Sequence, residues 1–227
     1  MNFKKICLAL VASIIFSCTP DTIETFDHAA QYVTEKPIVD EYLATHYFDD
    51  VDKEIKEIDA NQTALINDAN LQALSTNYND VDYVMYSYVY EQGQNEDVRD
   101  QNGNPRGEDA VVRDVVGSPD RDDLVNVAYK VFSLDGEVYE ESKRSDGFLY
   151  LDSLIEGWRI GMAVFRGGYS NEDDSEVYRE YTETGKGFMI IPSGLAYQNH
   201  GSGFIGQNEI IVFKIELRTV ISYGEDL

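Results

Sequence analysis

The sequence predicts an α+β protein in which an antiparallel sheet domain follows a helical and strand extension, and three observations carry this prediction. Residues 83–90 are rich in aromatic and β-branched side chains, which are typical of strands. Residues 125–129 alternate as a strand does, and an Asp-Gly turn at 135–136 predicts a hairpin that returns through residues 138–142. Residues 37–47 place apolar side chains four positions apart, which indicates a short amphipathic helix.

The first residues are typical of a secretory signal peptide. Two lysines precede an apolar stretch at residues 6–16, which is too short to cross a hydrocarbon core of roughly 30 Å but suits the apolar centre of a signal peptide. Residues 15–18, Ile-Phe-Ser-Cys, resemble the lipobox of bacterial lipoproteins, whose cysteine is acylated. We therefore expect removal of residues 1–17 and lipidation of Cys18. A plain signal peptide with an incidental cysteine is the alternative.

The cysteine content favours acylation. Cys7 lies in the segment expected to be removed, so Cys18 would be the single thiol of the mature chain and no disulfide could form within it. A free thiol is a liability in an oxidising compartment, whereas an acylated cysteine is not. We expect a lipid-anchored protein of the cell envelope, at the outer membrane, on either its periplasmic or its cell-surface face.

The chain is strongly acidic, with 18 basic and 42 acidic residues and a formal charge of −24. Residues 1–17 contain two lysines and no acidic residue, so their removal changes the charge to −26. Such a surface repels phosphate backbones and anionic head groups. This argues against nucleic-acid binding and leaves the lipid at Cys18 as the expected attachment to a membrane.

Residues 18–80 are expected to form a tether and an N-terminal helical extension. Pro37 suits the first turn of the helix predicted over residues 37–47. Residues 51–78 mix helical spacing of apolar side chains with repeated asparagines, and they predict no single element.

Residues 81–122 are expected to contain a strand and a polar hairpin. The strand at 83–90 should pair with the sheet of the following domain, and Asn102-Gly103 predicts the hairpin turn. The acidic and asparagine residues around this turn do not have the spacing of an EF-hand loop, so no metal site is expected.

Short motifs occur in a fixed order within residues 123–221. They are the alternating strand at 125–129, the Asp-Gly turn, Leu-Ile-Glu-Gly-Trp at 154–158, Ile-Pro-Ser-Gly-Leu-Ala-Tyr at 191–197 and the apolar strand at 210–217. This order resembles the FKBP-type peptidyl-prolyl cis-trans isomerases. The resemblance implies a twisted antiparallel sheet wrapped around a short helix, prolyl isomerase activity, proline-containing polypeptides as clients and no cofactor. The role expected for the chain is assistance in the folding of exported or outer-membrane proteins.

The chemistry explains why an aromatic pocket is expected. Rotation about a prolyl peptide bond must overcome the loss of amide conjugation, a barrier of about 18 to 20 kcal/mol for an amide, without breaking a covalent bond. The planar amide is more charge-separated than the twisted one, so water stabilises the ground state more than the transition state. A dry pocket with one well-placed hydrogen-bond donor removes that bias.

Carried over by position, the resemblance places Trp158 at the floor of this pocket and assigns Tyr197 to donate its hydroxyl to a substrate carbonyl. The residues implied in catalysis are Tyr129, Tyr139, Glu140, Trp158, Tyr197 and Phe213. Those implied in substrate binding are Phe148, Leu154, Ile155 and Ile205, with Tyr150 as an alternative to Phe148 because the segment before residue 154 is shorter than usual.

Three departures from the family pattern keep a second function open. Glu140 stands where aspartate is usual, Gln198 replaces a glycine, and Gly206-Gln207 replaces flap prolines. The alternative is an FKBP-fold binding or chaperone lipoprotein, or a surface-machinery component, with weak or no isomerase activity.

Two further expectations concern the surface. The acidic insertion at 169–185 is expected to be a solvated or partner-facing loop. A homodimer through the N-terminal helix is a possible assembly.

Overall fold

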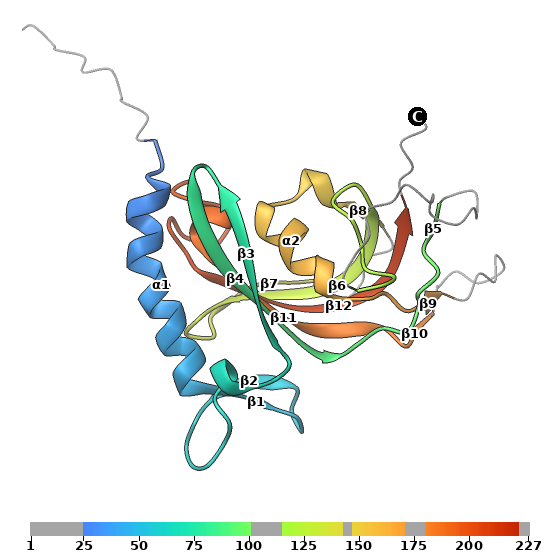
Figure 1. Ribbon diagram of the computed structural model, residues 1–227, viewed down its shortest axis with the longest axis horizontal. Coiled ribbons are helices and arrows are strands. Elements are labelled where there is room, and N and C mark those ends of the chain that lie inside the picture. Colours follow the sequence, from blue (N-terminus) through green and yellow to red (C-terminus); the bar gives the residue numbers. More distant parts are fainter. Residues whose placement is uncertain (1–24, 101–114, 143–146, 171–179, 223–227) are drawn as a thin grey trace, which may run out of the picture.

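The computed structural model describes residues 25–100, 115–142, 147–170 and 180–222 (Figure 1). Its main element is an eight-stranded sheet of order β3-β4-β11-β12-β6-β7, with β5 beside β12 and β8 beside β6. The strands are β3 (Leu71–Tyr78), β4 (Val81–Glu91), β5 (Arg99–Asp100), β6 (Leu124–Ser133), β7 (Val138–Ser142), β8 (Leu149–Tyr150), β11 (Gly185–Ile191) and β12 (Ile211–Ser222). Apart from the parallel pair β5–β12, neighbouring strands are antiparallel.

Two α-helices lie on opposite sides of this sheet. The sheet curls around α2 (Glu156–Gly161), whereas α1 (His28–Thr45) lies on the outer side (Figure 1). Short 3₁₀ turns accompany them: η1 (Leu65–Asn67), η2 (Leu151–Ser153), η3 (Met162–Val164) and η4 (Ser193–Leu195). The predicted fold, a curled antiparallel sheet around a short helix with an N-terminal extension, is confirmed.

The alternation of side chains along the central strands builds two cores. On β11, Met189 and Ile191 belong to the inner core around α2, whereas Phe188 and Ile190 belong to an outer core beneath α1. All four are at most 2% exposed. Because successive residues of a strand point to opposite faces, a sheet covered on both sides needs apolar residues at every position, as the run from Phe188 to Ile191 provides.

The hairpin predicted at the Asp-Gly turn is present between β6 and β7. Gly136 has a φ of 83° and its amide donates to the carbonyl of Ser133 at 3.0 Å. A positive φ is favourable for glycine and strained for most other residues, which explains the glycine here. The hairpin carries Tyr129 opposite Ser142.

The N-terminal helix is longer than predicted. Helix α1 begins at His28 and not at Pro37, with Asp27 as its N-cap: the carboxylate of Asp27 accepts from the amide of Ala30 at 3.0 Å. Pro37 is therefore in the helix interior. The prediction treated proline as a start signal, but the side chains of Glu35, Val39 and Leu43, all buried, hold the helix against the domain.

Residues 51–78, for which no element was predicted, contain β2 (Glu54–Glu57), η1 and β3. Strand β3 forms the edge of the main sheet and pairs with β4, which confirms the strand predicted at 83–90. Strand β4 pairs in turn with β11, with Tyr88 opposite Phe188. The extension thus completes the same sheet as the domain and is not limited to helix.

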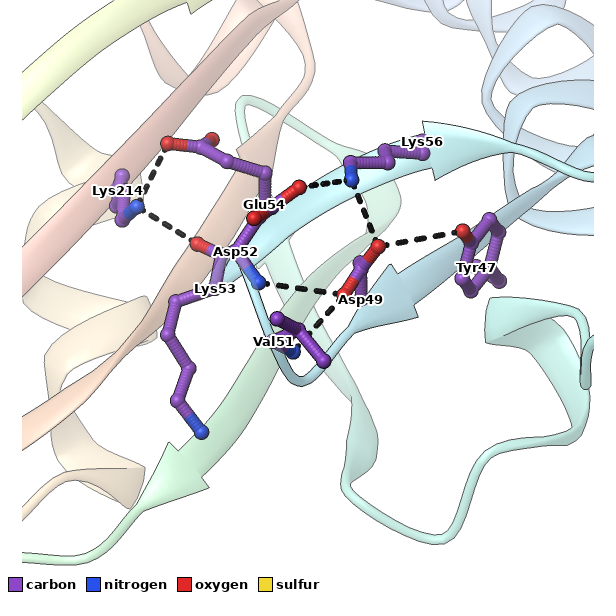
Figure 2. Close-up of polar contacts among 8 residues, drawn as sticks. All are labelled: Tyr47, Asp49, Val51, Asp52, Lys53, Glu54, Lys56 and Lys214. Carbon is purple, nitrogen blue, oxygen red and sulfur yellow. Dashed lines mark hydrogen bonds and ion pairs between the residues drawn. The ribbon is translucent and has the colours of Figure 1, made fainter.

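Strands β1 (His46–Asp49) and β2 form a separate hairpin that polar contacts fasten to the sheet (Figure 2). Asp49 pairs with Lys56 at 2.7 Å and accepts from the turn amides of Val51 and Asp52, and these contacts, the first above all, lower the pKa of Asp49 to about 2. Lys214 on β12 donates to the carbonyl of Lys53 at 2.6 Å and to Glu54 at 2.8 Å.

The two ends of the β11–β12 pair carry different loops. Gly185 faces Leu217 at one end, where the paired strands β9 (Tyr169–Ser170) and β10 (Tyr181–Thr182) lie at the base of the predicted insertion. Ile191 faces Ile211 at the other end, and residues 192–210 join the strands there. The predicted signal peptide, Cys18, the predicted turn at 102–103 and residues 171–179 of the insertion lie outside the described residues. Within the described ranges, no helix has the length and apolar character to span a membrane.

Candidate functional site

A cavity of about 420 Å³ lies on the inner face of the sheet, between α2 and the loop that follows η4. Aromatic and aliphatic side chains dominate its lining. The lining residues are Tyr129, Val131, Tyr139, Glu140, Leu149, Leu154, Ile155, Trp158, Tyr197, Ser202, Gly203, Phe204, Ile205 and Phe213. Small-molecule and peptide sites are typically apolar concavities of this size with few polar groups.

Trp158 reaches the floor of the cavity because α2 packs very closely on β11. A Cβ atom added to Gly157 would lie 2.3 Å from the side chain of Ile191, and one added to Gly161 would lie 2.5 Å from the sulfur of Met189. A Cβ atom at either position would force these neighbouring side chains to shift. The close approach buries the Trp158 side chain to 4% exposure.

Three rings form an edge-to-face cluster at this floor. The Trp158 ring centroid lies 5.1 Å from that of Phe213 and 5.7 Å from that of Tyr129, with interplanar angles of 81° and 89°. Such contacts contribute about 0.5–1.5 kcal/mol each beyond their buried area and fix the ring orientations. The indole is therefore held rigidly at the base of the cavity.

A phenol and a carboxylate are paired in the cavity wall. The hydroxyl of Tyr129 donates to the carboxylate of Glu140 at 2.6 Å. Burial and this contact raise the pKa of Tyr129 to about 12. Glu140 makes this contact although its side chain is longer than that of the aspartate usual in the family.

Two further phenols stay neutral at physiological pH. Burial, followed by a hydrogen bond to Glu209, raises the pKa of Tyr139 to about 12. Burial also raises the pKa of Tyr197. Among the residues that the structure describes, none forms a hydrogen bond with the Tyr197 hydroxyl, so this donor is available to a bound molecule.

The loop after η4 closes one side of the cavity with a tight turn. The amide of Ser202 donates to the carbonyl of Ile205 at 3.0 Å, and the amide of Ile205 donates back at 2.9 Å. Gly203, within this turn, has a φ of 59°. The turn buries Ile205 to 8% exposure but leaves the ring of Phe204 at the rim 88% exposed.

The structure brings together all of the predicted pocket residues except Phe148. Leu149 lines the cavity in its place, and the alternative Tyr150 does not. The reason is the register of β8, in which Leu149 lies opposite the buried Val125 and shares its inward face. Neighbouring residues of a strand face opposite ways, so the prediction was displaced by one position.

The sequence reasoning missed Val131, Leu149 and the loop residues 202–204. Val131 could have been found, because it lies two positions after Tyr129 on the same strand and so on the same face. No periodic sequence pattern predicts Phe204 at the cavity rim, because its position there depends on the turn around Gly203.

The cavity can hold a small apolar ring, and the hydroxyl of Tyr197 can donate a hydrogen bond to a carbonyl of the same bound molecule. Within the part of the chain that the structure describes, no group of three or more His, Cys, Asp or Glu side chains is arranged to hold a metal ion. What the cavity offers to a bound molecule is shape, low polarity and one directed hydrogen bond.

Comparisons with known proteins agree with this site. Residues 116–218 match the family described as FKBP-type peptidyl-prolyl cis-trans isomerase. A probable FKBP-type isomerase FkpA of Neisseria meningitidis is 32% identical over 102 residues, covering 44% of this chain and 32% of the relative. A probable FKBP-type 25 kDa isomerase of Pseudomonas aeruginosa is 31% identical over 94 residues, covering 41% of this chain and 34% of the relative. The chain thus spans about a third of the length of these curated relatives.

A solved peptidyl-prolyl isomerase of Pseudomonas syringae superposes with a TM-score of 0.49 and 18% identity, covering 86% of this chain and 96% of that one. The match over residues 116–218 contains every residue that lines the cavity, and it does not include the N-terminal extension. In sequence, residues 116–218 are therefore similar to the FKBP-type peptidyl-prolyl cis-trans isomerases.

Proposed function

We propose that the chain catalyses cis-trans isomerisation of Xaa-Pro peptide bonds in polypeptide clients. The observation that carries the proposal is the convergence of Trp158, Tyr129, Tyr197 and Phe213 on one cavity. The family match over residues 116–218 supports it.

The geometry suits this reaction in three ways. The indole of Trp158 provides a flat apolar floor for the proline ring, and Phe213 and Tyr129 hold it in place. The dry walls favour the less charge-separated twisted amide over the planar one. The free hydroxyl of Tyr197 can donate to the substrate carbonyl, and a contact that improves during the twist lowers the barrier.

A refolding assay tests the activity. We expect the chain to accelerate the proline-limited refolding phase of a test protein, a phase that takes tens to hundreds of seconds unassisted. Tyr197→Phe removes one hydrogen bond of about 0.5–1.5 kcal/mol and should lower kcat/KM by about two- to tenfold. Thr34→Ala, on the exposed face of α1, is the control and should retain full activity.

Two outcomes of this assay would speak against the proposal. Suppressed aggregation without a faster proline phase would favour the alternative of an FKBP-fold binding protein or chaperone. An unchanged kcat/KM in Tyr197→Phe would remove the assigned role of that hydroxyl.

We further propose that the chain is a lipid-anchored protein of the cell envelope that acts on exported or outer-membrane clients. The lysines, apolar stretch and Ile-Phe-Ser-Cys sequence at residues 1–18 support this. Labelling of producing bacteria with a radioactive fatty acid should mark the wild-type chain and the matched control Cys7→Ser, but not Cys18→Ser. A label that persists in Cys18→Ser would contradict the anchor.

A further inference from the structure

A buried carboxylate joins the N-terminal helix to the loop that carries Tyr197. Glu35 lies on α1, outside the matched residues 116–218, and is only 2% exposed. Its carboxylate accepts from the amide of Ser193 at 3.0 Å and from the hydroxyl of the same residue. Gln31, one turn earlier on α1, donates to it at 2.7 Å.

Ser193 is in turn the anchor of the Tyr197 backbone. Its carbonyl accepts from the amide of Ala196 at 2.9 Å and from that of Gln198 at 3.0 Å. These two residues flank Tyr197 directly, so the position of Ser193 determines where the Tyr197 side chain begins. Gln198 has a φ of 55°, a conformation that needs such support in a residue with a side chain.

The neighbouring contacts leave the loop little freedom to settle elsewhere. A Cβ atom on Gly194 would lie 2.1 Å from the hydroxyl oxygen of Tyr83. That hydroxyl contacts Nδ1 of His28 at 2.9 Å, at the start of α1. The loop is therefore held by α1 directly through Glu35, and by Tyr83 of β4, whose hydroxyl contacts the start of α1.

Burial of the Glu35 carboxylate is unfavourable, and its hydrogen-bond donors offset part of this cost. Burial raises the pKa of Glu35, and the hydrogen bonds from Ser193 and Gln31 oppose this effect. Hydrogen bonds to an ionised acceptor are stronger than neutral ones. Removing the acceptor would leave the buried amide of Ser193 without its partner, which disfavours the present position of the loop.

We propose that Glu35 is a positioning residue of the isomerase site, which acts through Ser193 to hold Tyr197 at the substrate carbonyl. The proposal rests on the proposed function. It makes the N-terminal helix a part of the active site, although no residue of that helix lines the cavity.

A double-mutant cycle tests this coupling. Glu35→Ala should lower kcat/KM by about the same factor as Tyr197→Phe, and should have less than about a twofold further effect when Tyr197 is already phenylalanine. Glu35→Gln keeps one acceptor oxygen for the Ser193 amide and should restore most of the activity. Leu43→Ala is the control: it creates a cavity between the same helix and the outer core, and it should leave kcat/KM unchanged while the protein is folded.

Amide exchange separates this proposal from the proposed function. In Glu35→Ala, the amides of Ala196 and Gln198 should exchange several-fold faster than in the wild type, whether or not the chain turns over substrate. Unchanged exchange would overturn the positioning role. So would equal losses of kcat/KM from Glu35→Ala in the wild-type and Tyr197→Phe backgrounds, because additive effects mean that the two residues act independently.

Discussion

Replacing Trp158 with leucine is expected to lower kcat/KM by more than tenfold, which corresponds to at least about 1.4 kcal/mol of transition-state stabilisation. The substitution removes the flat floor beneath the proline ring and both edge-to-face contacts with Tyr129 and Phe213, each worth about 0.5–1.5 kcal/mol. The proline-limited refolding assay measures this loss. Because Trp158 is the single tryptophan, the variant has no tryptophan fluorescence, and its unfolding should be followed by circular dichroism.

Phe165→Leu is the matched control for this variant. Phe165 is fully buried in the same inner core but does not line the cavity. It should lose stability by a similar mechanism while keeping its kcat/KM at temperatures where the protein is folded. If Phe165→Leu lost as much activity as Trp158→Leu, the loss would reflect general loosening of the core and not the floor of the pocket.

Leu43→Ala is expected to destabilise the whole protein by about 2–5 kcal/mol. Leu43 on α1 is fully buried and packs in the outer core with Leu65 and Phe188, so its truncation leaves a cavity between the extension and the sheet. Since a change of 1 kcal/mol shifts Tm by about 2–4 °C in a protein of this size, the shift should be about 4–20 °C. Thermal unfolding followed by circular dichroism measures it.

The exposed position Val33 on the same helix provides the control. Val33 is 74% exposed, and Val33→Ala should change the unfolding free energy by no more than about 0.5 kcal/mol. A separate early transition in Leu43→Ala, with the sheet still melting at the wild-type temperature, would contradict the view that extension and sheet form one cooperative unit.

The pocket residues were predicted from the resemblance to the FKBP-type isomerases, and their placement agrees with the regular geometry of strands and short motifs. Tyr129 and Phe213 lie on strands β6 and β12, where alternation fixes the inward face. Trp158 follows the glycine that allows α2 to approach β11. These relations depend on neighbouring residues in the sequence.

The features that were missed depend on contacts between distant residues. The first turns of α1 are held in the fold by Glu35, which is buried against Ser193, 158 positions away, and no local pattern reports this contact; the N-cap Asp27 is the local signal that was overlooked. Strand β3 has an exposed and polar pattern typical of a sheet edge, so its pairing with β4 had no hydrophobic signal. The choice of Leu149 over Phe148 depends on the register of a two-residue strand.

The most direct test of the aromatic pocket as an isomerase site is exchange spectroscopy by NMR on a short Xaa-Pro peptide. With the chain present at a small fraction of the peptide concentration, the cis and trans signals should interconvert well above the uncatalysed rate of about one event per tens to hundreds of seconds. Binding of the peptide, seen as a change in Trp158 fluorescence, combined with exchange at the uncatalysed rate, would contradict the account.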